Sequence, residues 1–203
     1  MIKAILFDLD GVLVDACDWH FDSLNMALKD VVGYEISRED HEIKYNGLPT
    51  KVKLKMLGVS DDDFDKIWNL KQRYTLNIIR DTAQIMQEKI ELHSWLKSNH
   101  IKIGCVTNSI RVTAEEMLRQ TGQYDFMDVL IANEDVENNK PYPDCYNKAV
   151  DLLDLPPSSI IIVEDSDKGV AAAISSKITR LMIVKNTLDV TLENVKKFIE
   201  DQG

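Results

Sequence analysis

Polar and acidic side chains follow three short apolar runs of the sequence, at the point where each run ends. Runs of this length, rich in Ile and Val, are typical of buried strands. Ligands of open parallel sheets bind at the carboxyl ends of the strands, so we expect these side chains to meet at one edge of a sheet. They are Asp8 and Asp10 after residues 4–7, Thr107, Asn108 and Ser109 after residues 101–106, and Glu164 and Asp165 after residues 160–163.

Carboxylates in such an arrangement could hold Mg²⁺ and could also attack phosphorus. Mg²⁺ prefers hard oxygen ligands and often shares them with a substrate phosphate. Asp8 and Asp165 can each supply a carboxylate oxygen, Asp10 a backbone carbonyl, and Glu164 lies beside Asp165. A carboxylate that attacks a phosphoryl group forms an acyl phosphate, which water then hydrolyses. The sequence therefore predicts a magnesium site built from Asp8, Asp10, Glu164 and Asp165.

Asp10 and three further residues could complete the chemistry. Two positions after Asp8 along an extended strand, the Asp10 side chain returns to the same face and could protonate a leaving oxygen, then deprotonate water. Thr107, the backbone around Asn108, and Lys140 could bind the phosphoryl oxygens and offset the negative charge.

The elements that position these residues follow from the pattern of apolar runs. Short runs separated by helical patterns predict an α/β fold, a Rossmann-like doubly wound core in which helices cover both faces of a parallel sheet. Helical spacing covers residues 112–120 and 192–199. Pro143 suits the first turn of a helix that carries Tyr146, Val150 and Leu153 on its apolar side. The expected strands are residues 4–7, 101–106, 129–132, 160–163 and 181–184.

Residues 16–80 interrupt the alternation of strands and helices. Three amphipathic helical patterns occupy this stretch, which lacks any strand-like run, so we expect an all-helical cap inserted after the first strand. The predicted domains are a Rossmann-like core at residues 1–15 plus 81–203 and a helical cap at residues 16–80. Asp15, at the junction, either caps the first cap helix or has a functional role.

Four segments resemble the four motifs of the haloacid dehalogenase superfamily, in the same order and across the whole chain. The resemblance is strongest to β-phosphoglucomutase and related sugar-phosphate phosphatases, which carry a helical cap after the first strand. An aspartate at the position of Asp10 is typical of the phosphotransferases rather than the dehalogenases. The segments are FDLDGVLVD at residues 7–15, VTNS at 106–109, Lys140-Pro141, and EDSDKG at 164–169.

The resemblance assigns a role to each matching residue. It implies Asp8 as nucleophile, Asp10 as acid and base, and Asp165 as metal ligand with Glu164 beside it. It also implies that Thr107 and Lys140 bind phosphate.

The expected cap departs from the mutase pattern, which leaves the substrate open. The hinge threonine of the mutase corresponds to Ala16, and its cap arginine to Thr50 near the turn at Gly47. His20 fits the mutase pattern, although a histidine there could equally be a core or surface residue of its helix. The candidate cap contacts to substrate are His20, Lys44, Thr50 and Lys51.

The predicted function is a Mg²⁺-dependent phosphatase that hydrolyses a small phosphate monoester, such as a sugar phosphate, through an aspartyl phosphate. A β-phosphoglucomutase-like mutase shares the first half-reaction and stays an alternative, as does a superfamily member that has lost catalysis and serves as a regulator. A signalling receiver domain is disfavoured, because its phosphoaccepting aspartate would end the third strand, where this sequence has Ala132.

Composition limits the partners. The 203 residues carry a formal net charge of −10, which argues against nucleic acid because phosphate neutralisation needs a basic face. The three cysteines lack the spacing of a zinc site or a disulfide framework, which indicates a reducing compartment. We expect a cytoplasmic protein, monomeric or weakly dimeric, that binds a small phosphorylated metabolite and neither nucleic acid nor membrane.

Overall fold

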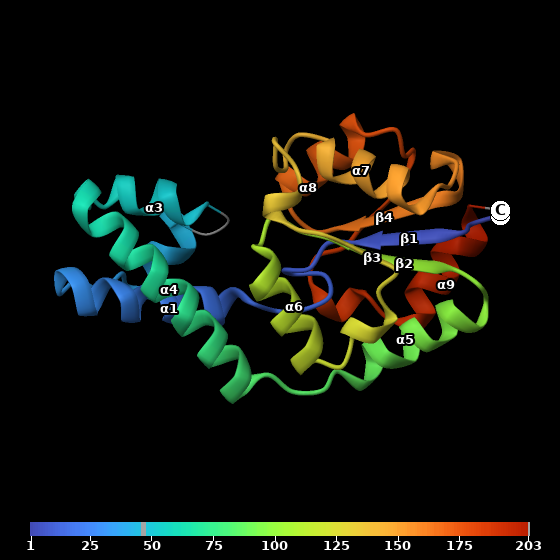
Figure 1. The fold of residues 1–203 in the computed structure, drawn as a ribbon. Coiled ribbons are helices and arrows are strands. Elements are labelled where there is room, and N and C mark those ends of the chain that lie inside the picture. The colour runs from blue at the N-terminus through green and yellow to red at the C-terminus, as the bar shows by residue number, and fades with distance from the viewer. Residues whose placement is uncertain (46–47, 203) are drawn as a thin grey trace. The chain divides into compact units, whose positions relative to one another are not determined.

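The computed structural model describes residues 1–45 and 48–202, and the chain divides into two compact units (Figure 1). The first unit comprises Met1–Asp15 with Ala83–Gly203, and the second comprises Ala16–Thr82. The second unit extends past the limit expected at residue 80, because its last helix continues to Thr82.

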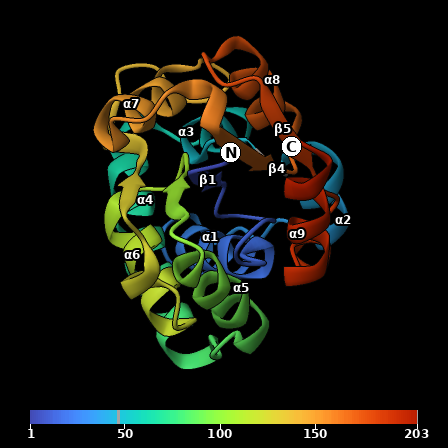
Figure 2. The same cartoon turned by 90° about the vertical axis from the view of Figure 1, so that its right-hand side faces the viewer.

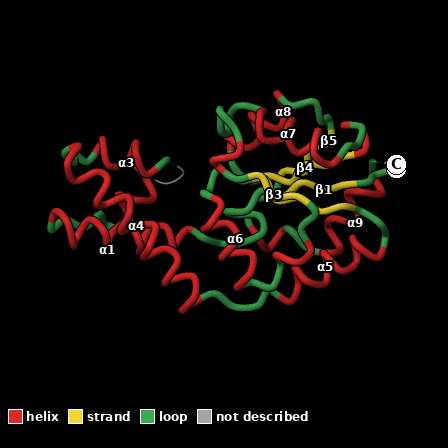
Figure 3. The backbone as a smooth tube through the Cα atoms, in the orientation of Figure 1, coloured by secondary structure: helices red, strands yellow, loops and turns green. Residues whose placement is uncertain are grey.

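A five-stranded sheet forms the centre of the first unit, and every strand pair in it is parallel. This confirms the predicted α/β class and the doubly wound core. The strand order is β3-β2-β1-β4-β5, so the first strand of the chain is the central one. Figure 3 shows the strands as a yellow layer between helices. The strands are β1 (Ala4–Phe7), β2 (Lys102–Val106), β3 (Val129–Ile131), β4 (Ile160–Glu164) and β5 (Arg180–Ile183).

Helices cover both faces of this sheet (Figure 2). On one face lie α7 (Asp144–Leu153) and α8 (Asp167–Ser175), whose Tyr146, Ala149 and Ala172 pack on buried residues of β1 and β4. The opposite face carries α5 (Gln87–Ser98), α6 (Arg111–Gln120) and α9 (Leu192–Asp201). Short 3₁₀ turns connect these elements at Tyr124–Phe126, Asn133–Asp135, Pro157–Ser159 and Thr187–Asp189.

Local signals set several of these boundaries. Thr191 caps α9, accepting a hydrogen bond from the backbone N–H of Asn194. Beyond α6, Gly122 adopts a positive φ of 78°, the conformation expected of a glycine just after a helix end. Pro143 stands at the N-cap position of α7, one residue before the first helical turn in which the sequence placed it.

The second unit is all-helical in its described residues, as predicted. Its core joins Leu24 and Leu28 to Leu54 and Ile67. The first helix has Ala16 at its N-cap position, so Asp15 does not occupy that cap. Gly47, near which the cap turn was expected, lies outside the described residues. The elements are α1 (Cys17–Val32), α2 (Arg38–Asp40), a π-helical turn (His41–Tyr45), α3 (Thr50–Met56) and α4 (Asp61–Thr82).

Across residues 1–45 and 48–202, none of the helices combines the length and the apolar character that crossing a membrane requires. Cys17 is exposed, Cys105 and Cys145 are buried, and all three carry free thiols.

A buried lysine joins α5 to the segment that precedes α9. The Lys89 ammonium, only 2 % exposed, donates hydrogen bonds to the carbonyl oxygens of Thr187 (2.6 Å) and Val190 (2.7 Å). Burial lowers the pKa of Lys89 to about 8, although neighbouring Glu88 acts in the opposite direction. Folding must therefore either bury the charged ammonium of Lys89 or remove its proton.

Lys89→Met should change how stability depends on alkaline pH. Between about pH 8 and the ordinary lysine value, the unfolded state of the parent binds more protons at this position than the folded state, so Lys89 makes stability rise with pH there. Between about pH 8 and about pH 9.5, the free energy of unfolding of the parent, measured with urea, should rise by about 1.5 kcal/mol relative to that of Lys89→Met. Lys197→Met, at an exposed lysine of α9, is the control. A difference that stays constant with pH would contradict the assignment.

Candidate active site

The carboxyl ends of β1, β2 and β4 bring together the residues that the sequence singled out. Asp8 continues β1 by one residue, with its backbone N–H bonded to the Val163 carbonyl at 3.0 Å. Thr107 directly follows β2, and Glu164 is the last residue of β4. The register that pairs Phe7 with both Cys105 and Val163 makes these three strands end at the same level.

Lys140 links these strand ends. Its buried ammonium donates hydrogen bonds to Asp8 Oδ1 (2.8 Å), to Glu164 Oε1 (2.7 Å) and to the Val106 carbonyl (2.7 Å). The Asn108 amide holds the loop that carries Lys140, accepting from the Lys140 N–H (3.0 Å) and donating to the Lys140 carbonyl (3.1 Å). The Asn108 side chain therefore positions this lysine, and the phosphate-binding role expected of Asn108 stays a prediction.

Glu164 is fully buried and hydrogen-bonded through both oxygens. Oε1 accepts from Lys140 and from the hydroxyl of Tyr146 on α7, and Oε2 accepts from the Asp165 N–H at 3.2 Å. The Lys140 ammonium also lies 5.1 Å from the centre of the Tyr146 ring. Sequence reasoning assigned Tyr146 only to the apolar face of its helix. The available signal was its hydroxyl, because a buried tyrosine O–H usually requires a partner.

Two glycines allow the backbone to approach the acidic side chains closely. A Cβ on Gly11 would lie 2.0 Å from Asp165 Oδ2, and a Cβ on Gly169 would lie 2.0 Å from the Glu164 carboxylate. Gly11 also has a φ of +85°, which side chains disfavour. The glycines of the first and fourth motifs are therefore required by the packing around Glu164 and Asp165.

Asp10 is half-buried and contacts the loop after β2. Its Oδ2 accepts a hydrogen bond from the Ser109 hydroxyl at 2.9 Å. The Thr107 hydroxyl oxygen accepts from the Ser109 N–H at 3.0 Å, which folds this loop back toward β1. Ser109 belongs to a motif that was identified in the sequence, but only the folded structure reveals its contact with Asp10.

Electrostatic crowding marks the site. Burial raises the pKa of Asp8 well above its ordinary value, Lys140 opposes this shift, and Glu164 adds to it. Burial, followed by the charge of Glu164, raises the pKa of Asp165 to about 6. For Lys140, burial opposes the charged form, but Asp8, Tyr146 and Glu164 outweigh it and raise the pKa.

The donor set fits a hard divalent cation. Asp8, Glu164 and Asp165 each present an oxygen, and these oxygens all lie within 4.8 Å of one another. Asp165 Oδ1 is buried and has no hydrogen-bond partner in the described part of the chain. A buried carboxylate oxygen without a partner is costly, and a cation bound by oxygen ligands would satisfy it.

The four candidate cap residues lie in the second unit. His20, on α1, is half-buried with its Nδ1 3.3 Å from the Lys71 ammonium. Lys44 is exposed and pairs with Asp40 at 2.7 Å. Thr50 and Lys51 begin α3, and Lys51 is exposed. Their roles stay predictions.

The family model for haloacid dehalogenase-like hydrolases matches residues 5–183 of the chain. This match spans the whole second unit, every motif described above and all five strands except Ala4 of β1. The protein belongs to the haloacid dehalogenase-like hydrolase family.

The proteins similar to this chain include a phosphatase and a phosphoglucomutase. The chain is 28 % identical over 191 residues to a phosphorylated carbohydrates phosphatase of Thermotoga maritima, a match covering 93 % of this chain and 88 % of that protein. It is 24 % identical to the β-phosphoglucomutase of Bacillus subtilis, covering 95 % and 93 % of the two chains. CbbY from Rhodobacter sphaeroides, solved in complex with phosphate, shares the fold with a TM-score of 0.80 and 24 % identity, covering 90 % of this chain and 86 % of that one.

Tyr146→Phe should weaken metal binding without preventing folding. The change removes only the hydroxyl that orients Glu164, and loss of a residue that orients a metal ligand typically weakens affinity by about tenfold or more. The half-saturating Mg²⁺ concentration should therefore rise by about tenfold, measured by thermal shift. Tyr142→Phe, at a residue 59 % exposed, is the matched control. An unchanged Mg²⁺ titration for Tyr146→Phe would show that the hydroxyl does not support the site.

Proposed function

We propose that the protein is a Mg²⁺-dependent phosphatase that hydrolyses a small phosphate monoester through a phospho-aspartate on Asp8. A sugar phosphate or a similar metabolite is the proposed substrate class, supported by the similarity to the Thermotoga maritima carbohydrate phosphatase. The observation that carries the proposal is a group of three carboxylates, two of which pair with the buried Lys140. The third, Asp165, has an Oδ1 without a hydrogen-bond partner among the residues that the structure describes.

Asp8, Glu164 and Asp165 are the residues proposed to hold Mg²⁺ through their carboxylates, and Asp10 is a further proposed ligand through its backbone carbonyl. When bound, Mg²⁺ would neutralise carboxylate charge and polarise the phosphoryl group. Its positive charge would also favour the ionised form of Asp8, which burial disfavours in the free protein.

In the first half-reaction, a carboxylate oxygen of Asp8 attacks phosphorus as the bond from phosphorus to the ester oxygen breaks. Asp10 donates a proton to the departing oxygen, so that an alcohol leaves rather than an alkoxide. Lys140 and the N–H groups of the Thr107–Ser109 loop would offset the charge on the transferring phosphoryl oxygens.

In the second half-reaction, water replaces the alcohol. Asp10, now ionised, takes a proton from water while the water oxygen attacks phosphorus and the acyl phosphate bond breaks. Inorganic phosphate leaves, and both aspartates return to their starting protonation states. The Ser109 hydroxyl, bonded to Asp10 Oδ2, would hold that carboxyl group in place through both steps.

The acceptor separates the phosphatase from a mutase. Both reactions proceed through the same phospho-aspartate, and a mutase delivers the phosphoryl group to a sugar hydroxyl instead of water. The identity to the Bacillus subtilis mutase is 24 % across nearly the whole chain, so both products should be assayed. His20, Lys44, Thr50 and Lys51 are the proposed substrate contacts of the cap.

Asp8→Asn should abolish turnover while preserving the fold. The amide keeps the size of the side chain but lacks the attacking charge, so phosphate release should fall by about a thousandfold or more. The measurement is free phosphate from a panel of phosphate esters with Mg²⁺, together with trapping of the acyl phosphate in the parent. A folded Asp8→Asn protein that retains a tenth of the parent activity would refute this mechanism. An inactive parent that traps no acyl phosphate would favour a regulatory member of the family.

Mg²⁺ should stabilise the protein as well as activate it. At about a hundred times its dissociation constant, a ligand of the folded state adds about 2.7 kcal/mol, which corresponds to about 5–10 °C in Tm for a chain of this size. Asp165→Asn should lose most of this shift, whereas Asp167→Asn, at an exposed residue of α8, should keep it. Full activity in excess chelator, or an equal thermal shift in Asp165→Asn, would contradict the assigned metal site.

A further inference from the structure

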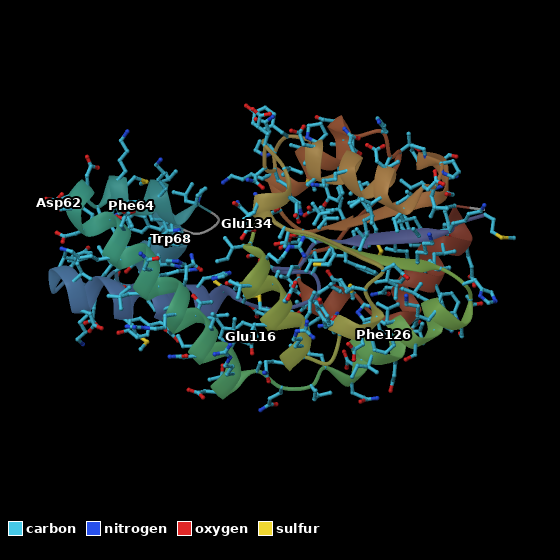
Figure 4. The ribbon with its side chains drawn as sticks, viewed as in Figure 1. Asp62, Phe64, Trp68, Glu116, Phe126 and Glu134 are labelled. Atoms are coloured by element: carbon cyan, nitrogen blue, oxygen red, sulfur yellow. The ribbon has the colours of Figure 1, made fainter. Side chains whose placement is uncertain are left out.

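A buried polar pair lies beneath the nucleophile strand and outside the proposed chemistry. His93 of α5 and Gln123, just beyond α6, are both fully buried, and His93 Nε2 lies 3.0 Å from Gln123 Oε1. Glu116 and Phe126, labelled in Figure 4, lie on the two elements that Thr121–Gln123 connects. Burying polar groups costs free energy of folding, so we expect this pair to have a function.

Gln123 anchors the turn that follows Asp8. Its amide nitrogen donates to the Leu13 carbonyl at 3.2 Å and to the Thr121 hydroxyl at 2.9 Å. The turn itself is tight, because the N–H groups of both Leu13 and Val14 bond to the Leu9 carbonyl at 2.9 Å. Asp10 lies inside the turn Leu9–Val14, so an anchor at Leu13 restrains the backbone that carries Asp10.

The hydrogen-bond pattern determines the form of His93. A carbonyl oxygen such as that of Leu13 only accepts, so the nitrogen of the Gln123 amide must face it. The amide oxygen then faces His93 Nε2, which must carry a proton, and burial keeps the ring neutral by lowering the pKa of His93 to about 4. The His93 ring also lies edge-on to Phe7, the residue before Asp8, with ring centres 5.8 Å apart. His93 therefore orients Gln123 and supports the strand end at the same time.

The segment Thr121–Gln123 also forms hydrogen bonds close to both junctions between the units. The chain leaves the first unit after Asp15 and returns to it at Ala83. Gln123 bonds to Leu13 on the outgoing side, and the Thr121 carbonyl accepts from the Met86 N–H at 3.1 Å on the returning side. The Gln123 amide nitrogen also lies 3.8 Å from the Met86 sulfur.

We propose that Gln123, oriented by its hydrogen bond to His93, is a positioning residue that fixes the Leu9–Val14 turn and thereby the Asp10 carboxyl group. The inference rests on the acid and base role proposed above for Asp10. Gln123 contacts none of the residues assigned to metal or phosphate, namely Asp8, Thr107, Lys140, Glu164 and Asp165, in the hydrogen bonds of the described chain. Its loss should therefore reduce kcat and leave KM and Mg²⁺ affinity nearly unchanged.

Two variants separate positioning from simple stability. Gln123→Met keeps the side-chain length but leaves the buried His93 N–H without an acceptor, so Tm should fall. Combining it with His93→Leu replaces both partners by apolar groups, which can be nearly neutral for stability, so Tm should recover. In both the single and the double variant, the Leu13 carbonyl loses the hydrogen bond that Gln123 donates in the parent. Gln120→Met, the same substitution at a residue whose amide bonds Glu116 on the helix surface, is the matched control.

Two measurements test the proposal, both made at a temperature well below the Tm of the least stable variant. Amide hydrogen exchange of residues 9–14 should be about tenfold faster in both variants and unchanged in Gln120→Met. With p-nitrophenyl phosphate and Mg²⁺, kcat should fall by about tenfold or more in both variants, since small misplacements of a catalytic group cost this much, while KM stays within about twofold.

Each outcome decides the inference. Recovery of kcat together with Tm in the double variant would mean that Gln123 contributes stability alone. Unchanged exchange in residues 9–14, or faster exchange with unaltered kcat, would overturn the link from Gln123 to Asp10. If Gln123→Met fails to fold, the double variant carries the same test. A parent that lacks turnover, with exchange still accelerated in the variants, would overturn the proposed function and the role of Asp10 while confirming the anchor.

Discussion

The ion pairs between Lys140 and the two carboxylates of Asp8 and Glu164 are the constraint on which the rest of the site depends. Two buried acids at neighbouring strand ends repel each other, and at low dielectric such repulsion is expensive. The Lys140 ammonium, 2.8 Å and 2.7 Å from their oxygens, offsets part of that repulsion. Asp165 adds a further negative charge that Lys140 does not contact directly, and a divalent cation would balance it.

Much of the surrounding structure can be understood as support for this charge arrangement. The parallel register brings the strand ends to one level, and the Asn108 amide fixes the loop from which Lys140 reaches inward. Tyr146 supplies Glu164 with a second donor, and Gly11 and Gly169 leave room for the carboxylates. Each of these features satisfies or accommodates a buried polar group that would otherwise destabilise the fold.

The sequence predicted the strands and the strand-end residues well, because both depend on local pattern. Five apolar runs became five parallel strands, and the polar residues that ended them met at one edge. Contacts between residues distant in sequence were harder to predict. Tyr146 looked like a core residue of its helix, Ser109 carried no sign of its bond to Asp10, and Asn108 proved to hold Lys140. The His93–Gln123 pair left no pattern at all, since a lone histidine and a lone glutamine are ordinary in any sequence.

The central position of β1 also affects how the chain acquires its structure during synthesis. Ala4 pairs with Lys102 on one side and with Ile160 on the other, so the first strand made is flanked only after most of the chain has emerged. Residues 16–82, by contrast, are continuous and possess their own core, built from contacts such as those among Leu24, Leu28 and Ile67. Local contacts form faster than distant ones, because less loop-closure entropy is lost. The helical unit can therefore form its local contacts before β1, an entirely apolar strand, meets both of its neighbours, so this strand stays exposed for longer during synthesis.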